Sequence, residues 1–256
     1  MTPPHTADTR PLYEQVADAL RHKIDTGEYE PGHAIPSEAD LQATYGVSRD
    51  TVRKALTQLT QEGLLAGGQG RTRQVRRYAP LRWALASIER FDSTGPDNAG
   101  DPWSTEVRRQ GRRPHETVEL GIVVPPTRIA ELLNLTPERD FAVLRKRIRF
   151  VDDRPYQLAD SYFPEHLIRG TPLMEPRSVQ IPGGVLAAIG HPQARYKDEI
   201  SVRMPTRSES DRLDLPTATP VAEVVRTGYS ADGTPLRVMV SIAPGDRHIL
   251  VYEVDA

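Results

Sequence analysis

Two helix-forming segments separated by one glycine constrain the fold of this chain more than any other feature. The first spans about residues 37–45 and the second about residues 48–62, with Gly46 between them. Ser37 and Ser48 stand at the two starts, where a serine hydroxyl can accept a hydrogen bond from an unpaired backbone N–H of the first turn. A helix, a glycine-containing turn and a second helix predict a helix-turn-helix unit.

The second of these helices has two unlike faces. One face carries an apolar stripe at helical spacing, made of Val52, Ala55, Leu56 and Leu59. Arg49, Arg53 and Lys54 leave that stripe and place positive charge on the exposed side, near the N-terminal end. This is what a recognition helix in a DNA major groove requires. An amphipathic helix with a solvated basic face would show the same pattern, so this helix alone leaves both interpretations open.

The distribution of charge favours a nucleic-acid partner. The formal net charge of the chain is -2, but residues 49–77 hold seven basic and two acidic residues, a net charge of +5. Residues 1–48 hold three basic and eight acidic residues. A surface polarised in this way steers a protein onto phosphate.

Length and composition indicate a globular protein of two domains. A chain of 256 residues can bury two cores, and it is 38% hydrophobic and 27% charged. No run of about 18 apolar residues occurs, so no membrane helix is expected. Residues 1–10 are polar and predict a disordered arm rather than a secretory signal. The absence of cysteine excludes disulfides and thiolate metal sites and fits a cytoplasmic location.

A helix and a hairpin are expected on either side of the helix-turn-helix. A helical stripe over residues 12–26 ends at Gly27. After Gly63, residues 64–66 and 72–75 predict two short strands joined by a glycine-rich basic tip, which together would form a β-wing. Glycines allow the backbone to approach phosphate or enter a minor groove. An ordinary hairpin with solvated arginines is the alternative.

Several spaced motifs together resemble the GntR family of bacterial transcription regulators. They are Pro11-Leu12-Tyr13, Pro36-Ser37-Glu38, Ser48-Arg49-Asp50-Thr51-Val52-Arg53, Glu62-Gly63-Leu64 and Gly70-Arg71. The resemblance covers about residues 11–76 and implies a winged helix-turn-helix that binds a double-stranded DNA operator. It also implies a homodimer, with each subunit taking one half-site of a palindrome.

The resemblance assigns DNA contacts to individual residues. Arg49 and Arg53 would reach base edges, Ser48 and Thr51 would hold phosphates, and the wing tip would enter the minor groove. The full set of expected DNA-binding residues is Ser37, Ser48, Arg49, Asp50, Thr51, Arg53, Lys54, Gln69, Gly70 and Arg71. Two positions depart from the family pattern. Ala39 stands where relatives often carry arginine, and Thr72-Arg73 stands where the wing usually has Gly-Thr.

The rest of the chain predicts an α+β domain on an antiparallel sheet. Residues 77–83 are expected as a linker, and residues 92–102 as a loop. Asp232-Gly233 is a strong hairpin-turn signal. Expected strands span 118–124, 142–151, 156–162, 196–204, 221–229, 235–242 and 249–254, and expected helices span 127–133, 184–189 and 206–213.

Residues 84–256 resemble the UTRA ligand-sensing domain of the HutC-type GntR subfamily, whose fold is similar to chorismate lyase. The resemblance rests on motifs in a shared order: Glu89-Arg90-Phe91, Arg147-Ile148-Arg149, Leu158-Ala159-Asp160-Ser161-Tyr162-Phe163-Pro164, Arg226-Thr227-Gly228-Tyr229 and Val251-Tyr252-Glu253. It implies an effector-binding and dimerisation domain.

The expected effector is a small anionic molecule. Arg147 and Arg149 lie two apart on a strand and so share a face, where two guanidinium groups can hold a phosphate or carboxylate. A solvated sheet face is the alternative. The resemblance adds Arg90, Phe91, Ser161 and Tyr229, of which Phe91 could instead be core and the last two ordinary strand residues. Ala159 replaces a glutamate of many sugar-phosphate binders.

Three functions therefore compete. The first is a repressor released from its operator by a metabolite, and the second is a constitutive DNA-binding repressor whose C-terminal domain only dimerises. The third is an enzyme with a DNA-binding appendage. The seven histidines show no metal-ligand spacing, and no phosphate-binding glycine loop is present. The sequence thus favours a regulator with no catalytic site, metal or cofactor.

Overall fold

The computed structural model describes residues 10–67, 72–76, 80–85, 102–137, 139–179, 181, 184–216 and 219–253. The chain divides into two compact units, the first built mainly from residues 1–79 and the second beginning at residue 80. Among the described residues, no helix combines the length and the apolarity needed to cross a membrane.

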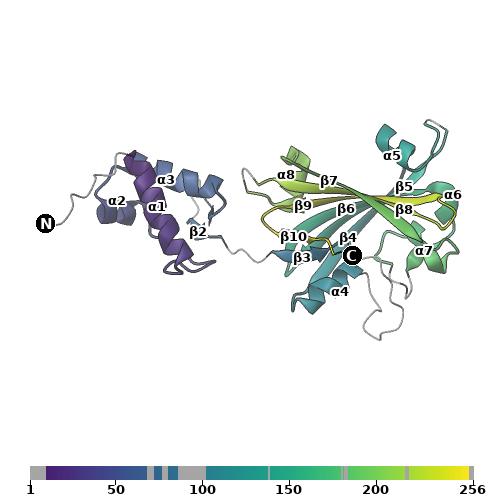
Figure 1. Cartoon of the computed structure of the whole chain (residues 1–256), viewed down its shortest axis with the longest axis horizontal. Helices are drawn as coiled ribbons and strands as arrows, with labels where there is room; N and C mark the ends of the chain where they lie inside the picture. The colour runs from purple at the N-terminus through teal and green to yellow at the C-terminus, as the bar shows by residue number, and fades with distance from the viewer. Residues whose placement is uncertain are drawn as a thin grey trace. The chain divides into compact units, whose positions relative to one another are not determined.

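The first unit is a three-helix cluster with a small antiparallel wing (Figure 1). Helices α1 (Leu12–Asp25), α2 (Glu38–Tyr45) and α3 (Arg49–Gln61) are followed by strands β1 (Leu65–Ala66) and β2 (Gln74–Val75). Gly46 ends α2 with a φ of 64°, a left-handed conformation that glycine adopts without strain. The expected helix-turn-helix is confirmed.

The core of the first unit gathers the apolar stripes of its three helices. The fully buried stripe of α3 packs with α1 residues Val16, Ala17 and Leu20 and with Leu41 of α2. Wing residues Leu65 and Val75 close the same cluster. The apolar spacing that predicted the α3 helix is thus the reason for its position, because that stripe is what the other helices cover.

The second unit is built on a six-stranded antiparallel sheet in the order β4-β5-β6-β9-β8-β7. Its strands are β4 (Pro114–Val123), β5 (Ala142–Val151), β6 (Arg154–Pro164), β7 (Arg195–Arg203), β8 (Val221–Tyr229) and β9 (Pro235–Pro244). The expected α+β class is confirmed. Asp152 and Asp153, with φ of 49° and 66°, form the tight turn between β5 and β6.

Helices cover both faces of this sheet (Figure 1). Helices α5 (Thr127–Leu132) and α8 (Arg207–Leu213) pack on one face through Ile129 and Leu213. The other face is covered by short elements: α4 (Pro102–Arg109), α6 (Glu165–Ile168), a 3-10 turn (Pro172–Met174) and α7 (Val185–Ala188).

A two-stranded parallel ribbon also packs on the second face, and the sequence did not predict it. Strand β3 (Leu81–Ala84) pairs with β10 (His248–Val251), and Trp83 packs against Val224 of β8. Residues 81–83 were expected in a linker, and β10 was expected in the main sheet. Each strand is only four residues long, and their partners lie far apart in sequence, so local pattern could not pair them.

Candidate functional site

The N-terminal turn of α3 is organised by two hydroxyl groups. The Ser48 hydroxyl caps the helix by accepting the Thr51 backbone N–H at 3.2 Å, and it lies 2.9 Å from the Thr51 hydroxyl. Both groups therefore sit where the free N–H groups and the positive end of the helix dipole favour an anion.

Exposed charged side chains follow on the next positions of α3. Arg49 has 72% of its side chain exposed, and Arg53 is also exposed. Lys54 pairs with Asp50 at 2.9 Å across one helical turn. Six expected DNA-binding residues, Ser48 to Thr51 with Arg53 and Lys54, thus lie together on the first turns of α3, opposite its buried stripe.

A carboxylate of α2 joins this cluster. Glu38 accepts a hydrogen bond from Arg49 Nε at 3.0 Å and another from Arg73 Nη1 at 3.1 Å. Arg73 is held beside α2 because the Ile35 N–H donates to its carbonyl at 3.1 Å. The bond from Arg49 is the main cause that lowers the pKa of Glu38. Glu38 and Arg73 were not predicted from the sequence to lie beside the basic residues of α3.

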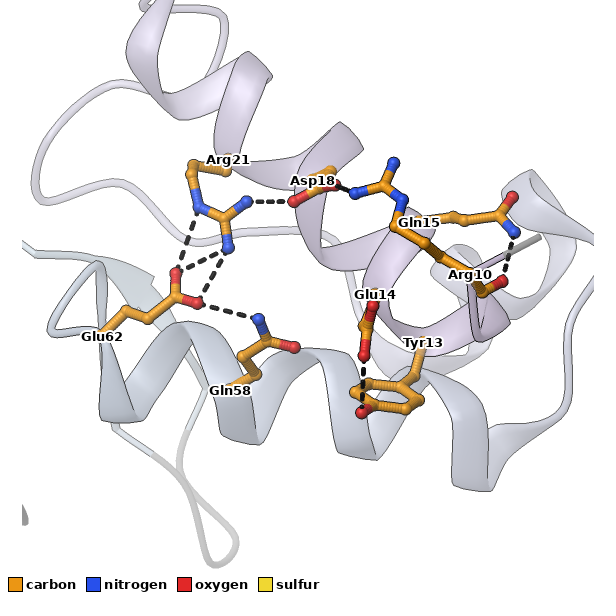
Figure 2. Close-up of polar contacts among 8 residues, drawn as sticks. All are labelled: Arg10, Tyr13, Glu14, Gln15, Asp18, Arg21, Gln58 and Glu62. Carbon is orange, nitrogen blue, oxygen red and sulfur yellow. Dashed lines mark hydrogen bonds and ion pairs between the residues drawn. The ribbon is translucent and has the colours of Figure 1, made fainter. Parts of the chain in front are cut away.

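A polar brace joins α1 to the C-terminal end of α3 (Figure 2). Arg21 Nη2 donates to both carboxylate oxygens of Glu62 at 2.8 Å, and Arg21 Nη1 donates to Asp18. Gln58 donates to Glu62 at 2.9 Å. The hydrogen bond from Arg21 is the first cause that lowers the pKa of Asp18. This network lies along the C-terminal half of α3 and leaves its first turns open.

Of the remaining expected DNA-binding residues, the structure describes Ser37 and does not describe the three at the wing tip. Ser37 caps α2, and its capping box with Asp40 is complete. Its hydroxyl donates to the Asp40 carboxylate at 2.6 Å, so it already has a partner inside the protein. Gln69, Gly70 and Arg71 lie outside the described residues.

In the second unit, the arginine-rich strand is not a solvated face. Of the two arginines expected to hold the effector, Arg149 is only 3% exposed and Arg147 is partly exposed, and the neighbouring Arg145 is 4% exposed. Arg145 donates to the backbone carbonyls of Leu173, Glu175 and Arg177 at 2.6–2.7 Å. This arginine holds the loop after α6 against the sheet, and its burial lowers its pKa.

Arg147 and Ser161, both expected effector ligands, lie in contact. Arg147 Nη2 donates to the Ser161 hydroxyl at 2.7 Å, and its Nε donates to the Ala159 carbonyl at 3.2 Å. Met239 of β9 lies 3.7 Å away through its sulfur. The structure therefore brings β5, β6 and β9 together around this guanidinium group.

Arg149 is more deeply enclosed than Arg147. It stacks over the Trp103 ring with 4.9 Å between its guanidinium carbon and the ring centroid, and donates to Gln157 at 3.1 Å. The carboxylate of Glu116 lies 3.6 Å from its Nε. Glu116 in turn accepts a bond from Ser178 at 2.7 Å.

Two further polar side chains lie on this face, and the sequence analysis missed both. Gln157 and Ser241 are fully buried, and register places Gln157 opposite Arg149 and Ser241 opposite Ala159. Among the residues that the structure describes, neither the Gln157 amide nitrogen nor the Ser241 hydroxyl has a hydrogen-bond partner. A buried polar atom without a partner is costly, so these atoms mark a place where a polar ligand would be stabilised.

Of the other expected effector residues, the structure describes only Tyr229. Tyr229 lies at the end of β8, where Arg195 stacks over its ring at 4.2 Å. Arg90 and Phe91 lie outside the described residues. Arg226 of the same motif as Tyr229 is 1% exposed and forms a two-pronged ion pair with Asp198 at 2.6–2.7 Å. It also donates to the Leu85 carbonyl at 2.6 Å.

A cavity of about 380 Å³ opens at another part of the second unit, near Asn134, His166 and the β8–β9 turn. Its charged lining includes the carboxylates Asp140 and Asp232 and no arginine. These carboxylates would repel an anion. The sheet face that carries Arg145, Arg147 and Arg149, which we call the arginine-lined face, is therefore the better anion site. Within the described residues, no group of three or more His, Asp or Glu side chains could hold a metal ion.

Both units match known families of domains. Residues 12–75 match "Bacterial regulatory proteins, gntR family", and residues 109–249 match the UTRA domain. The mannosyl-D-glycerate transport/metabolism system repressor MngR of Escherichia coli (strain K12) is 30% identical to this chain over 88% of each protein. The HTH-type transcriptional repressor NagR of Bacillus subtilis (strain 168) is 27% identical over 96% of this chain and 95% of that protein.

A solved structure is similar over the whole length. The crystal structure of a GntR-family transcriptional regulator has a TM-score of 0.63 and 26% identity, and the match covers 96% of this chain and 98% of that one. This match includes both the helix-turn-helix unit and the sheet.

Proposed function

Because this chain belongs to the gntR family of bacterial regulatory proteins and carries a UTRA domain, we propose that it is a repressor that a small anionic metabolite releases from DNA. The family makes it a DNA-binding transcriptional regulator and not an enzyme. The finer points, which are the contact residues, the palindrome, the dimer and the effector, are our proposal.

We propose that α3 enters the major groove. The exposed Arg49 and Arg53 would reach base edges, and the hydroxyls of Ser48 and Thr51 would bind phosphate at the helix N-terminus. The resemblance alone supports minor-groove contacts by Gln69, Gly70 and Arg71. Two copies of the chain would read two half-sites related by the dimer axis.

One observation carries the effector proposal: polar groups without partners lie beside buried arginines on a covered sheet face. Burying a guanidinium group costs free energy unless acceptors surround it. Arg147 and Arg149 meet several acceptors, whereas the Ser241 hydroxyl and the Gln157 amide nitrogen have no hydrogen-bond partner among the described residues. A carboxylate or phosphate would bring acceptors for these two groups and a negative charge beside both arginines.

The name of one relative supports this choice of ligand chemistry. The name of MngR links that protein to mannosyl-D-glycerate, and glycerate carries a carboxylate. Arg90, Phe91 and Tyr229 remain proposed members of the site through the family resemblance. The ring of Tyr229 stacks against Arg195.

The release of DNA would follow from a difference in affinity. A ligand shifts a conformational equilibrium only as far as it prefers one state, and such coupling is typically about 1–3 kcal/mol. Ligand bound at the arginine-lined face would favour an arrangement of the two helix-turn-helix units that no longer fits the operator.

The proposal is tested by gel shift on the upstream DNA of its own gene, across a salt series, with a panel of carboxylated and phosphorylated metabolites. We expect one compound to release the specific complex and to raise the melting temperature of the protein. The variant Arg147→Ala/Arg149→Ala should keep operator affinity and lose this response, whereas Lys146→Ala, on the exposed side of β5, should respond normally.

Each failure would have its own meaning. Specific binding that no compound alters would favour the constitutive repressor whose second domain only dimerises. Full release in the double arginine variant would remove the arginine-lined face as the effector site.

A further inference from the structure

The ion pairs of Glu38 place a negative charge within the surface proposed to read DNA. Its carboxylate lies between Arg49 of α3 and Arg73, just ahead of wing strand β2, at 3.0 and 3.1 Å. A carboxylate facing phosphates is unfavourable for general affinity. Its position therefore calls for an explanation other than tighter DNA binding.

Stability of the fold does not explain the ion pair of Glu38 with Arg49. Arg49 is 72% exposed, and an exposed ion pair contributes little to folding. This pair is weak enough to break when DNA binds. In the free protein its hydrogen bond occupies the Nε of Arg49.

Arg73 makes the position of Glu38 independent of Arg49. The Arg73 side chain is 20% exposed and Glu38 is 24% exposed, so this pair is the more enclosed of the two. The Ile35 N–H donates to the Arg73 carbonyl, and this backbone hydrogen bond holds Arg73 beside Glu38. When Arg49 turns to DNA, Glu38 would stay in place with its charge balanced by Arg73.

We propose that Glu38 is a specificity-determining residue. Its carboxylate, held in place by Arg73, competes with DNA phosphate for Arg49, so that Arg49 leaves Glu38 only when it can bind a matching base edge. A DNA phosphate attracts Arg49 through its negative charge, as Glu38 already does, so Arg49 gains little by exchanging one for the other. A guanine edge offers two acceptors in the plane of the guanidinium group and wins the competition.

This role also gives a use to the two positions that depart from the family pattern. Ala39 leaves α2 without the arginine that relatives often have next to Glu38, and Arg73 stands where the wing usually has threonine. In this chain the positive charge beside Glu38 thus comes from Arg73 of the wing and not from α2.

The inference rests on the proposed contact of Arg49 with DNA, and it is tested with the full-length protein. A duplex is selected from a random pool by the wild type, and binding to this duplex and to a scrambled one is measured by fluorescence anisotropy. Glu38→Gln should bind the scrambled duplex about tenfold more tightly and the selected one less than about threefold more tightly, so that discrimination falls.

Three further variants separate this role from a general charge effect. Glu28→Gln changes the net charge equally, but that carboxylate pairs with Lys23, so discrimination should stay at the wild-type value. Glu38→Asp keeps the charge but shortens the reach to Arg49, so discrimination should fall. In an Arg49→Gln background, Glu38→Gln should no longer change the ratio. Circular dichroism melting confirms that each variant is folded.

The outcomes are distinct. A wild type that prefers no duplex would defeat the base-reading proposal, and this inference with it. A wild type that discriminates, together with a Glu38→Gln variant that keeps the same ratio, would overturn the role of Glu38 alone. An effect of Glu38→Gln that persists without Arg49 would overturn it as well.

Discussion

Arg145, Arg147 and Arg149 share one face of β5, yet each is suited to a different task by the acceptors around it. Arg145 is bound by three backbone carbonyls, which are fixed and uncharged. Arg149 meets an aromatic ring, an amide and a carboxylate. Arg147, partly exposed, bonds a hydroxyl and one carbonyl. The first arginine therefore has a structural role, and the other two are the ones that we propose to bind the effector.

This difference predicts unequal costs of truncation. Arg145→Ala should lower the free energy of unfolding by about 2–4 kcal/mol, because it removes the donor to three backbone carbonyls, of which that of Leu173 is buried, and removes packing. Arg147→Ala should cost less than about 1.5 kcal/mol, since a partly exposed site can admit water. Urea unfolding followed by circular dichroism measures both, with the exposed Lys146→Ala as control. Equal losses for the two arginines would contradict the structural role of Arg145.

The other residue-scale prediction concerns Arg53 on α3. Arg53→Ala should weaken binding to the selected operator by about 1–3 kcal/mol and relax the preference at one base position. Binding to random DNA should change less, because a base contact exists only on the matching sequence. Competition binding on a set of single-base operator variants measures this, and Arg108→Ala on α4 is an exposed arginine control. An equal loss on all sequences would indicate a phosphate contact.

At the residue scale, sequence reasoning reached only part of the candidate site. Strand alternation correctly placed Arg147 and Arg149 on one face, and the structure puts the expected Ser161 against Arg147. Gln157 was missed because the tight turn at Asp152-Asp153 would by itself pair Arg149 with Tyr156. An irregularity between Arg149 and Phe150 shifts the pairing by one residue, so that Gln157 faces Arg149.

At the element scale, long periodic segments were predictable and short paired ones were not. The helices α1 and α3 and the strand β8 lie within about one residue of their expected bounds, because each buries a regular apolar face; β5 and α8 also match their expected bounds. Helix α4 was not expected. Its buried residues Trp103 and Val107 contact Leu81 of β3, so its core face depends on a strand that was itself missed.

The ribbon of β3 and β10 gives an element-scale prediction about pH. His248 at the start of β10 is buried between the Trp83 and Tyr156 rings, and its Nδ1 lies 3.1 Å from the Pro244 carbonyl. Burial lowers the pKa of His248 from 6.5 to about 4, with smaller contributions from Arg247 and Arg112. The folded protein therefore keeps this ring neutral where the unfolded chain would take up a proton.

Stability from this histidine should be fully present above pH 6.5 and decline as the pH falls toward about 4. The whole loss should be about 3 kcal/mol, because one pKa unit corresponds to about 1.4 kcal/mol. His248→Phe keeps a ring between Trp83 and Tyr156 but cannot titrate. Chemical unfolding at several pH values should show a shallower decline for this variant between pH 6.5 and 4. An identical decline would mean that other groups cause it.

At the scale of the whole molecule, the two units have separate cores, so the proposed ligand and the DNA would act on different folded bodies. Helix α3 is set by the first core and by the Arg21–Glu62 brace, and the arginine-lined face is set by the sheet of the second unit. Regulation therefore requires a coupling free energy between two binding sites that share no side chain in these cores.

Coupling of this kind is reciprocal, and this gives the last prediction. If the releasing metabolite weakens operator binding by a given factor, operator DNA must weaken metabolite binding by the same factor, about 5- to 150-fold for coupling of about 1–3 kcal/mol. Calorimetric titration of the metabolite into free protein and into the protein–operator complex measures the second factor, and anisotropy measures the first. A scrambled duplex, present at the same concentration, controls for general effects of DNA. If the metabolite did not bind the protein–operator complex at all, release would come from direct competition at the DNA surface, and this result would contradict a regulator with two separate, coupled sites.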